Sequence, residues 1–318
     1  MRFARHPILR RDLGILAFYF LLALTLTYPL IAHFDTFGPG HGVDDPAQTW
    51  SLWWFKYATF NLGTSPLNTD YVFYPLGINL VAYTPTFLNG LISIPLQFVF
   101  GVIVAQNLIV LFSLVFGGYG AFLFVREVFS QFEGSDSNST TLAAALAGGV
   151  YAFGAWHLNY AVAGHFMLLS NEWIPYFALY LIRWPKSRWR NGARAGLFFV
   201  MATWTELTFA PFLAVLTVLY LLYQAVLVRP GTSWKNAKSP RPPESFRAKL
   251  RPIVFNLFAM GAISGIGISP LVFNLFTDFQ RYGYYLTSGV GRIQIFSAEP
   301  ISFFLPSAQH PLLGAWAN

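Results

Sequence analysis

Two things are scarce in this chain of 318 residues, namely cysteine and charge. The chain contains no cysteine, so disulfide bonds and thiolate metal sites are excluded. Only 10% of its residues are charged and 55% are hydrophobic, whereas about 25% of the residues of a soluble domain are charged. So few solvated side chains predict an integral membrane protein.

Common catalytic motifs of soluble enzymes are also absent. There is no G-x-S-x-G, no H-E-x-x-H and no P-loop, which argues against ATP-driven and serine-hydrolase chemistry. The formal net charge is +7, but the basic residues form short clusters between apolar segments, as topology signals do. Because basic patches interleaved with stacking aromatic residues are missing, nucleic-acid binding is not expected.

The first long apolar run extends from Leu13 to His33 and follows a basic N-terminal segment. About 20 apolar residues can cross a hydrocarbon core of about 30 Å. A cleaved signal peptide would have a shorter apolar core and a small-residue cleavage site. We therefore predict an uncleaved first transmembrane helix whose N-terminus lies in the cytoplasm.

Residues 34–103 are predicted to form a long outer loop. Its first part has four acids, Asp35, Asp44, Asp45 and Asp70, against the single Lys56, and such depletion of basic residues is typical of the outer side. The Trp-rich segment Gln48–Phe60 predicts a helix that either lies on the membrane surface or packs as an ordinary loop helix. A second, juxtamembrane helix is expected over Thr86–Val102.

The expected fold is an all-α polytopic membrane protein with about seven transmembrane helices. After the first helix, the spans are placed at Val104–Val125, Thr140–Ala155, Ser170–Trp184, a helical hairpin over Ala195–Val228, and Pro252–Phe276. Residues 156–169 then form a short second outer loop. With this topology, seventeen of the 20 Lys and Arg residues lie on the cytoplasmic side, as the positive-inside rule requires.

These assignments divide the chain into a transmembrane module, residues 1–276, and an outer segment, residues 277–318. The module includes a basic, proline-containing cytoplasmic linker over residues 229–251. The outer segment ends without a closing span, so we expect the chain to be the N-terminal part of a longer protein.

Ionisable residues next to apolar spans are costly and are therefore functional candidates. The outer-side candidates are Asp44 and Asp45, the second-loop residues His157, His165 and Glu172, the hairpin acid Glu206, and, further along, Arg281, Arg292 and His310. Acids that accept a hydroxyl proton and cations that neutralise a leaving phosphate are what a phosphate-linked substrate requires.

Each candidate also has a structural interpretation. One of the two aspartates is expected to cap the helix that begins near Ala47, and Asp45, directly before Pro46, suits that role better. That leaves Asp44, facing His165 and Arg281, as the expected base. The other side chains divide into three kinds of alternative. His157 and His165 are either metal ligands or loop residues, Glu172 and Glu206 either functional or capping and turn acids, and Arg281 and Arg292 either phosphate-binding or interfacial anchors.

Four segments carry a family resemblance, GVDDPAQTWSLWW, SPLNTDYVFYPLG, AGHFMLLSNEWIPY and FFLPSAQHPLLG. With the predicted topology, they resemble a poorly characterised bacterial branch of the GT-C superfamily of membrane glycosyltransferases. The resemblance implies that Asp44 or Asp45 is the general base or orients the acceptor hydroxyl. The family's second acid has no D-x-D or D-x-E match here, so His157, His165 or Glu172 would take its place.

The resemblance implies transfer of a sugar from a polyprenyl-phosphate-linked donor to an acceptor at the outer face of the cytoplasmic membrane. A divalent metal, Mg²⁺ or Mn²⁺, is a candidate cofactor without assigned ligands. Two alternatives are a transporter or flippase of lipid-linked glycans and a non-catalytic assembly protein with the same fold. Acids buried in mid-span together with a partner would favour the transporter.

Overall fold

The computed structural model describes residues 7–42, 44–83, 86–130, 138–227 and 246–283. These residues are mostly helical, with one short two-stranded sheet, which agrees with the predicted all-α class. The chain divides into two compact units, Met1–Asn274 and Leu275–Asn318. Only the end of the last helix and Gly283 are described in the second unit. Arg292, His310 and most of the predicted linker lie outside the described residues.

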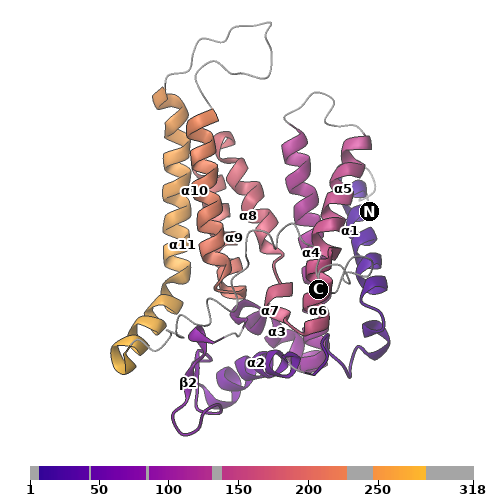
Figure 1. Ribbon diagram of the computed structural model, residues 1–318, viewed down its shortest axis with the longest axis vertical. Coiled ribbons are helices and arrows are strands. Elements are labelled where there is room, and N and C mark those ends of the chain that lie inside the picture. The colour runs from indigo at the N-terminus through magenta and orange to yellow at the C-terminus, as the bar shows by residue number, and fades with distance from the viewer. Residues whose placement is uncertain (1–6, 43, 84–85, 131–137, 228–245, 284–318) are drawn as a thin grey trace, which may run out of the picture. The chain divides into compact units, whose positions relative to one another are not determined.

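Helices that run along a common direction form the body of the first unit (Figure 1). One group holds α1 (Pro7–Leu26), α4 (Val102–Phe129) and α5 (Asn138–Phe153). The other group holds α8 (Trp173–Ile182), α9 (Arg190–Thr205), α10 (Phe209–Leu227) and the first part of α11 (Phe246–Tyr282). Two shorter helices, α6 (Ala155–Ala163) and α7 (Phe166–Leu169), connect α5 to α8.

Two further helices, α2 (Asp45–Tyr57) and α3 (Phe87–Phe100), lie across one end of this body (Figure 1). The hairpin of β1 (Asn68–Thr69) and β2 (Ile78–Asn79) follows α2, and its antiparallel register pairs Asn68 with Asn79. Short helical turns complete the chain at Leu30–His33, Ala58–Leu62, Leu80–Ala82 and Trp184–Lys186.

Among the described residues, three helical segments are long and apolar enough to cross a membrane, Val102–Phe129, Asn138–Ala163 and Arg251–Tyr282. This supports the predicted membrane environment. The predicted span Ser170–Trp184 contains only the 10-residue α8, which is about 15 Å long and therefore shorter than a hydrocarbon core of about 30 Å. The helix is short because the chain is not helical at Ser170 and Asn171.

Two boundaries differ from those predicted. The first helix ends at Leu26, and only a 3-10 turn follows over Leu30–His33, because Pro29 has no amide hydrogen to continue a helix. Residues 156–169, predicted as an outer loop, are largely helical as α6 and α7. Positions 155–163 carry no proline or glycine that would interrupt a helix.

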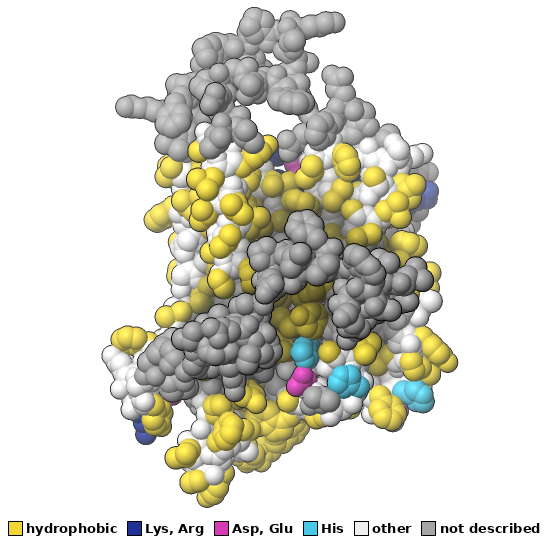
Figure 2. Space-filling model, in the orientation of Figure 1, with side chains coloured by type: hydrophobic (Ala, Val, Ile, Leu, Met, Phe, Trp, Pro, Cys, Tyr) yellow, Lys and Arg dark blue, Asp and Glu magenta, His cyan; other side chains and the backbone are white. Residues whose placement is uncertain are grey.

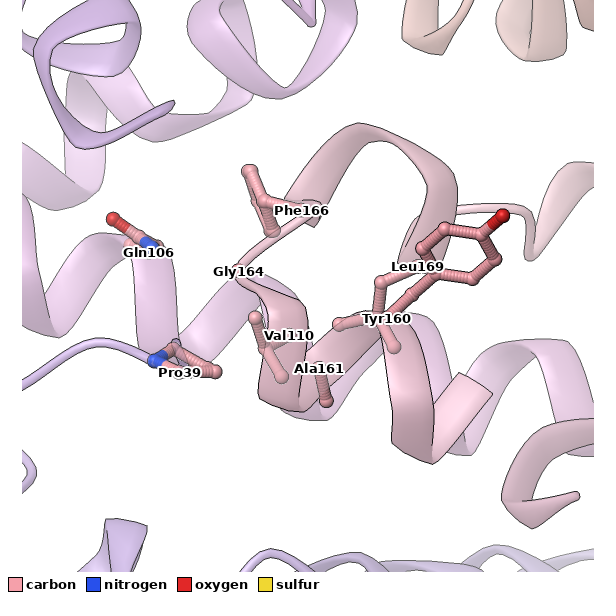
Figure 3. Close-up of a pocket in the computed structure, with 8 residues that line it drawn as sticks. All are labelled: Pro39, Gln106, Val110, Tyr160, Ala161, Gly164, Phe166 and Leu169. Carbon is pink, nitrogen blue, oxygen red and sulfur yellow. The ribbon is translucent and has the colours of Figure 1, made fainter. Parts of the chain in front are cut away.

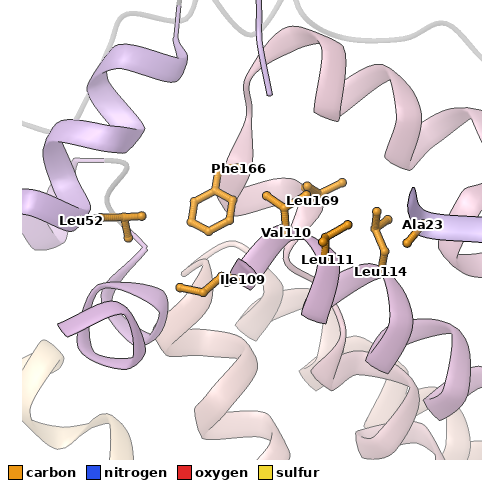
Figure 4. Close-up of a cluster of buried hydrophobic side chains, with 8 residues drawn as sticks. All are labelled: Ala23, Leu52, Ile109, Val110, Leu111, Leu114, Phe166 and Leu169. Atoms are coloured by element: carbon orange, nitrogen blue, oxygen red, sulfur yellow. The ribbon is translucent and has the colours of Figure 1, made fainter. Parts of the chain in front are cut away.

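One hydrophobic core lies around the first half of α4 (Figure 4). Ile109, Val110, Leu111 and Leu114 of this helix meet buried side chains from three other elements, Ala23 of α1, Leu52 of α2, and Phe166 and Leu169 of α7. Because α2 and α7 share this core, the first part of the outer loop and the corner after α6 are both held against α4.

Small residues allow α4 and α5 to approach closely. A Cβ added at Gly148 of α5 would lie 2.4 Å from the carbonyl oxygen of Gly118 in α4 and 2.2 Å from the hydroxyl of Tyr19 in α1. That hydroxyl donates to the carbonyl oxygen of Ala145 at 2.7 Å. Glycine and alanine at such contacts are typical of helices that associate in membranes.

One face of α2, the predicted helix of the first loop, is packed against the rest of the protein. Gln48, Ser51, Leu52 and Phe55 recur at helical spacing and are buried, and α3 packs against α2. From α3, the amide of Gln97 donates to the carbonyl oxygen of Leu52 at 2.7 Å. The ordinary packed-helix interpretation therefore describes α2.

Candidate functional site

Asp44 and His165 form the most direct contact between predicted site residues. Oδ2 of Asp44 lies 2.5 Å from Nε2 of His165, although 121 residues separate them in sequence. The two side chains are 52% and 31% exposed, respectively. The space-filling view shows acidic and histidine side chains together in the lower part of this face, where α2 lies (Figure 2). The surface above them is mostly hydrophobic. The pair therefore joins the first loop to the α6–α7 corner at an accessible position.

Asp44 stands at the N-cap position of α2, but its side chain makes no capping hydrogen bond. The expectation that Asp45 would be the cap is wrong, because the helix begins at Asp45. Oδ1 of Asp45 instead accepts a hydrogen bond from the amide of Gly42 at 2.7 Å. Asp45 thus ties down the preceding glycine loop, and the other oxygen of Asp44 makes no hydrogen bond to any described residue.

Glycine is required on both sides of Asp45. Gly40 has φ +141°, and a Cβ there would lie 2.4 Å from Cγ of Asp45. Gly164 ends α6 with φ +75°, and a Cβ there would lie 2.8 Å from Cβ of Asp45. Left-handed backbone of this kind favours glycine. Because Gly164 turns the chain directly against Asp45, the next residue, His165, reaches Asp44.

Polar side chains at the start of α4 hold this loop in place. Thr49 of α2 donates to Oε1 of Gln106 at 2.6 Å. The amide of Asn107 donates to the carbonyl oxygens of Phe34 and Phe37 at 2.9 and 2.7 Å. Sequence analysis did not identify Gln106 and Asn107. The sequence feature that could have identified them is two adjacent amide side chains in the apolar run VIVAQNLIV, where polar residues need hydrogen-bond partners.

His165 is oriented by its neighbours. Its ring stacks on Tyr160 with centroids 5.5 Å apart. Its Nδ1 is buried and has no hydrogen-bond partner among the described residues. Since a carboxylate only accepts hydrogen bonds, an ionised Asp44 receives its bond from Nε2–H. The free oxygen of Asp44 is therefore the atom of this pair that can accept a proton from a substrate.

A narrow crevice lies beside the pair (Figure 3). Pro39 and Gln106 lie on one side of it, and Tyr160 and Leu169 lie on the other. The space between these residues is too narrow to admit even a water molecule. The crevice connects the first loop to the α6–α7 corner, but it has no room for a saccharide in this conformation.

His157 and Glu172 belong to a second, buried group. Nε2 of His157 lies 2.8 Å from Oδ1 of Asn171, and the hydroxyl of Tyr151 donates to the same oxygen at 3.0 Å. Glu172 is 1% exposed, and a Cβ added at Gly117 of α4 would lie 3.4 Å from its Cα. The three second-loop candidates are therefore not gathered in one site.

The separation of the two groups follows from their positions on α4. Gln106 lines the crevice beside His165, whereas Gly117 touches Glu172. Eleven residues of α-helix between these positions correspond to about 16 Å. Glu172 thus lies about three turns further along the bundle than the accessible pair.

Glu206 also has a structural role, at the tip between α9 and α10. It is 9% exposed, and its Oε1 accepts a hydrogen bond from the amide of Thr208 at 3.2 Å. It is thus a buried turn acid and not a solvated one. Arg281 is an exposed residue in the last turn of α11, and its guanidinium lies 5.3 Å from the ring centre of Tyr282. This contact is typical of an interfacial anchor.

A divalent metal does not fit the Asp44–His165 pair. The carboxylate and the imidazole bond directly to each other, so they do not point at a shared cation. No group of three His, Asp or Glu side chains that could hold a metal ion occurs within residues 7–42, 44–83, 86–130, 138–227 and 246–283. Zinc sites, by contrast, normally have three or four such ligands.

Comparisons of the whole chain with protein-family models, with curated proteins and with solved structures found no match.

Proposed function

We propose that the chain is the transmembrane module of a GT-C-type glycosyltransferase, which transfers a sugar from a polyprenyl-phosphate-linked donor to an acceptor at the outer face of the cytoplasmic membrane. The observation that carries the proposal is the Asp44–His165 pair, which brings a first-loop acid together with a polar residue from after α6. This is the combination that the resemblance to the superfamily implies.

In the proposed membrane topology, seven helices cross the bilayer: α1, α4, α5, α8, α9, α10 and α11. The N-terminus is cytoplasmic, and α2, α3 and the α6–α7 corner are on the outer side. The charge distribution supports this orientation, since most Lys and Arg residues then face the cytoplasm. The 10-residue α8 crosses together with residues 170–172 before it and the turn Trp184–Lys186 after it.

In the proposed reaction, the free oxygen of Asp44 accepts the proton of the acceptor hydroxyl. The acceptor oxygen then forms a bond to the anomeric carbon as the bond from that carbon to the phosphate oxygen breaks. Polyprenyl phosphate leaves with the bonding electron pair, and the configuration inverts. His165 positions Asp44, and a cationic group neutralises the leaving phosphate.

Donor binding requires the crevice to open. Because the crevice does not admit even a water molecule, the α6–α7 corner has to move away from Pro39 to let a saccharide enter. The glycine at position 164, which ends α6 with φ +75°, is the natural hinge for this movement.

The test is transfer of sugar from a synthetic polyprenyl-phosphate donor by the purified protein. Asp44→Asn should lower the rate by about 10²-fold or more, as loss of a general base does. Asp45→Asn is the matched control, because it changes the neighbouring carboxylate, which bonds to Gly42. If both variants kept the wild-type rate, Asp44 would not be the base.

Transport of a lipid-linked glycan is the second candidate function, and Glu172 favours it. A carboxylate that is 1% exposed, and about 16 Å further along α4 than the outer pair, is typical of coupling sites in transporters. No charged partner accompanies it among the described residues. Uptake of a fluorescent lipid-linked glycan by proteoliposomes, without any transfer of sugar, would favour transport over transfer.

A further inference from the structure

The chain breaks its helical structure between α7 and α8 inside the bundle. Ser170, Asn171 and Glu172 link these helices and are 0%, 7% and 1% exposed. At membrane depth, non-helical backbone is tolerated only where protein buries it or where it lines a cavity. Broken helices of this kind supply carbonyl and carboxylate oxygens to bound cations in membrane proteins.

Glu172 carries the charge at this break. Neither of its carboxylate oxygens has a hydrogen-bond partner in the part of the chain that the structure describes, nor does any described Lys, Arg or His pair with it. An ionised carboxylate that is buried without partners costs many kcal/mol. Either a bound proton or a bound cation therefore has to neutralise Glu172.

The polar groups beside the carboxylate are a hydroxyl and the backbone N–H of Glu172, and no described cation pairs with it. Ser113, one turn before Gly117 on α4, neighbours the carboxylate, and its hydroxyl lies 3.3 Å from the hydroxyl of Ser170. A Cβ at Gly117 would lie 3.4 Å from both the Cα of Glu172 and the ring of Tyr151, so Glu172 is packed closely against α4. Carboxylate and hydroxyl oxygens are the ligands of hard cations.

Neighbouring side chains hold the break rigid. The hydroxyl of Tyr151 donates to both the backbone and the side-chain oxygen of Asn171 at 3.0 Å, and His157 bonds to the same side-chain oxygen at 2.8 Å. These bonds occupy the amide oxygen of Asn171 and fix the backbone on either side. The hydroxyl of Ser113 is left beside both the carboxylate of Glu172 and the hydroxyl of Ser170.

We propose that this break is a binding site for a single Na⁺ ion. Glu172 is its one anionic ligand, and the hydroxyls of Ser113 and Ser170 are neutral ligands. One carboxylate balances the charge of a monovalent ion, whereas a divalent ion would leave a buried positive charge. The site is separate from the Asp44–His165 pair and does not depend on the proposed sugar transfer.

The test measures the thermal unfolding of the purified full-length protein in detergent. NaCl is replaced stepwise by choline chloride at constant ionic strength, so that only the ion identity changes. Because a ligand that binds only the folded state stabilises it, the Tm should rise with Na⁺ concentration and then saturate. Glu172→Gln should remove this response, since the isosteric amide has no charge to balance the ion.

Glu206→Gln is the matched control, because Glu206 is a buried acid engaged by Thr208, and it should keep the wild-type response. Ser113→Ala should raise the half-saturating Na⁺ concentration about tenfold, as the loss of supporting groups around a metal typically does. A wild-type Tm that does not change with Na⁺ concentration would overturn the proposal. That result is expected if a proton, and not Na⁺, neutralises Glu172. So would an unchanged half-saturating concentration in Ser113→Ala, even if Glu172→Gln did not fold.

The Na⁺ site and the proposed transferase activity fail independently. Asp44→Asn should lose sugar transfer yet keep the Na⁺-dependent Tm. A protein that responds to Na⁺ without transferring sugar would keep this inference and reject the proposed function.

Discussion

Glu127 is the residue that joins the far end of α4 to the end of α8. It is 8% exposed and accepts hydrogen bonds from Arg183, at 2.7 Å to Nε, and from Lys186. The two cations are more exposed than the acid, at 33% and 55%. The acid is therefore the desolvated member, and its loss leaves two cations without a counter-charge at one place.

We expect Glu127→Gln to lower the free energy of unfolding by about 1–3 kcal/mol, below the full cost of breaking a buried pair because Arg183 and Lys186 are partly solvated. Lys186→Gln removes an exposed partner and should change it by less than about 1 kcal/mol. Thermal unfolding in detergent measures both. Equal losses in the two variants would contradict the ranking.

The Asp44–His165 contact also makes a prediction at the residue scale. His165 touches the proposed base without being positioned to accept the substrate proton, because its Nδ1 is buried. We expect His165→Gln to lower the rate of sugar transfer about tenfold, less than Asp44→Asn, with kcat affected more than KM. Steady-state kinetics on the two variants compares them. A larger effect at His165 would make the imidazole the base.

At the scale of elements, the contact between α4 and α5 is set by backbone approach. Gly148 faces the carbonyl oxygen of Gly118, whereas its neighbour Gly149 has no atom within 4 Å of an added Cβ. Both lie in α5, so they share helix propensity and differ only in what they face. Substitutions at the two glycines therefore distinguish the effect of helix packing from the effect of helix propensity.

Gly148→Ala should destabilise the protein by about 1–3 kcal/mol, because the added methyl group forces the two helices apart. Gly149→Ala should instead be neutral or stabilise it by up to about 1 kcal/mol through helix propensity. Unfolding temperatures of the two variants provide the comparison. A tolerated Gly148→Ala would mean that α5 is free to shift along α4.

The glycine loop before α2 gives a second pair of matched positions. Gly40 and Gly42 both have positive φ, but only a Cβ at Gly40 meets Asp45. Gly40→Ala should therefore lower sugar transfer and stability more than Gly42→Ala, whose cost is limited to about 1–2 kcal/mol of backbone strain. Activity and Tm of both variants test this. Equal effects would show that Asp45 can move without consequence.

At the scale of the whole molecule, the proposed topology can be tested directly because the chain has no cysteine. Single cysteines introduced at two exposed positions, Thr64 and Arg190, report their side of the membrane without a background signal. In intact cells, a membrane-impermeable thiol reagent should label Thr64→Cys and not Arg190→Cys. Labelling of both or the reverse pattern would contradict the assigned orientation.

Composition and apolar periodicity were sufficient to predict the helical class and the positions of most helices. Apolar runs and proline or glycine breaks are local properties, and they placed α3, α4 and α5 close to their observed bounds. The same signals were insufficient for α8. The buried non-helical link at Ser170 and Asn171 contains no proline or glycine from which a helix break could be predicted.

The sequence alone determined that the chain is apolar, helical and free of thiol chemistry, because these follow from residue types and their spacing. It also singled out Asp44, His165 and Glu172 as costly polar residues. Only the tertiary structure decided their partners. The packing of α2 and α7 on α4 brings Asp44 to His165 across 121 residues, and the same helix buries Glu172 about three turns away. Contacts between segments so distant in sequence depend on how helices pack, which no local pattern encodes.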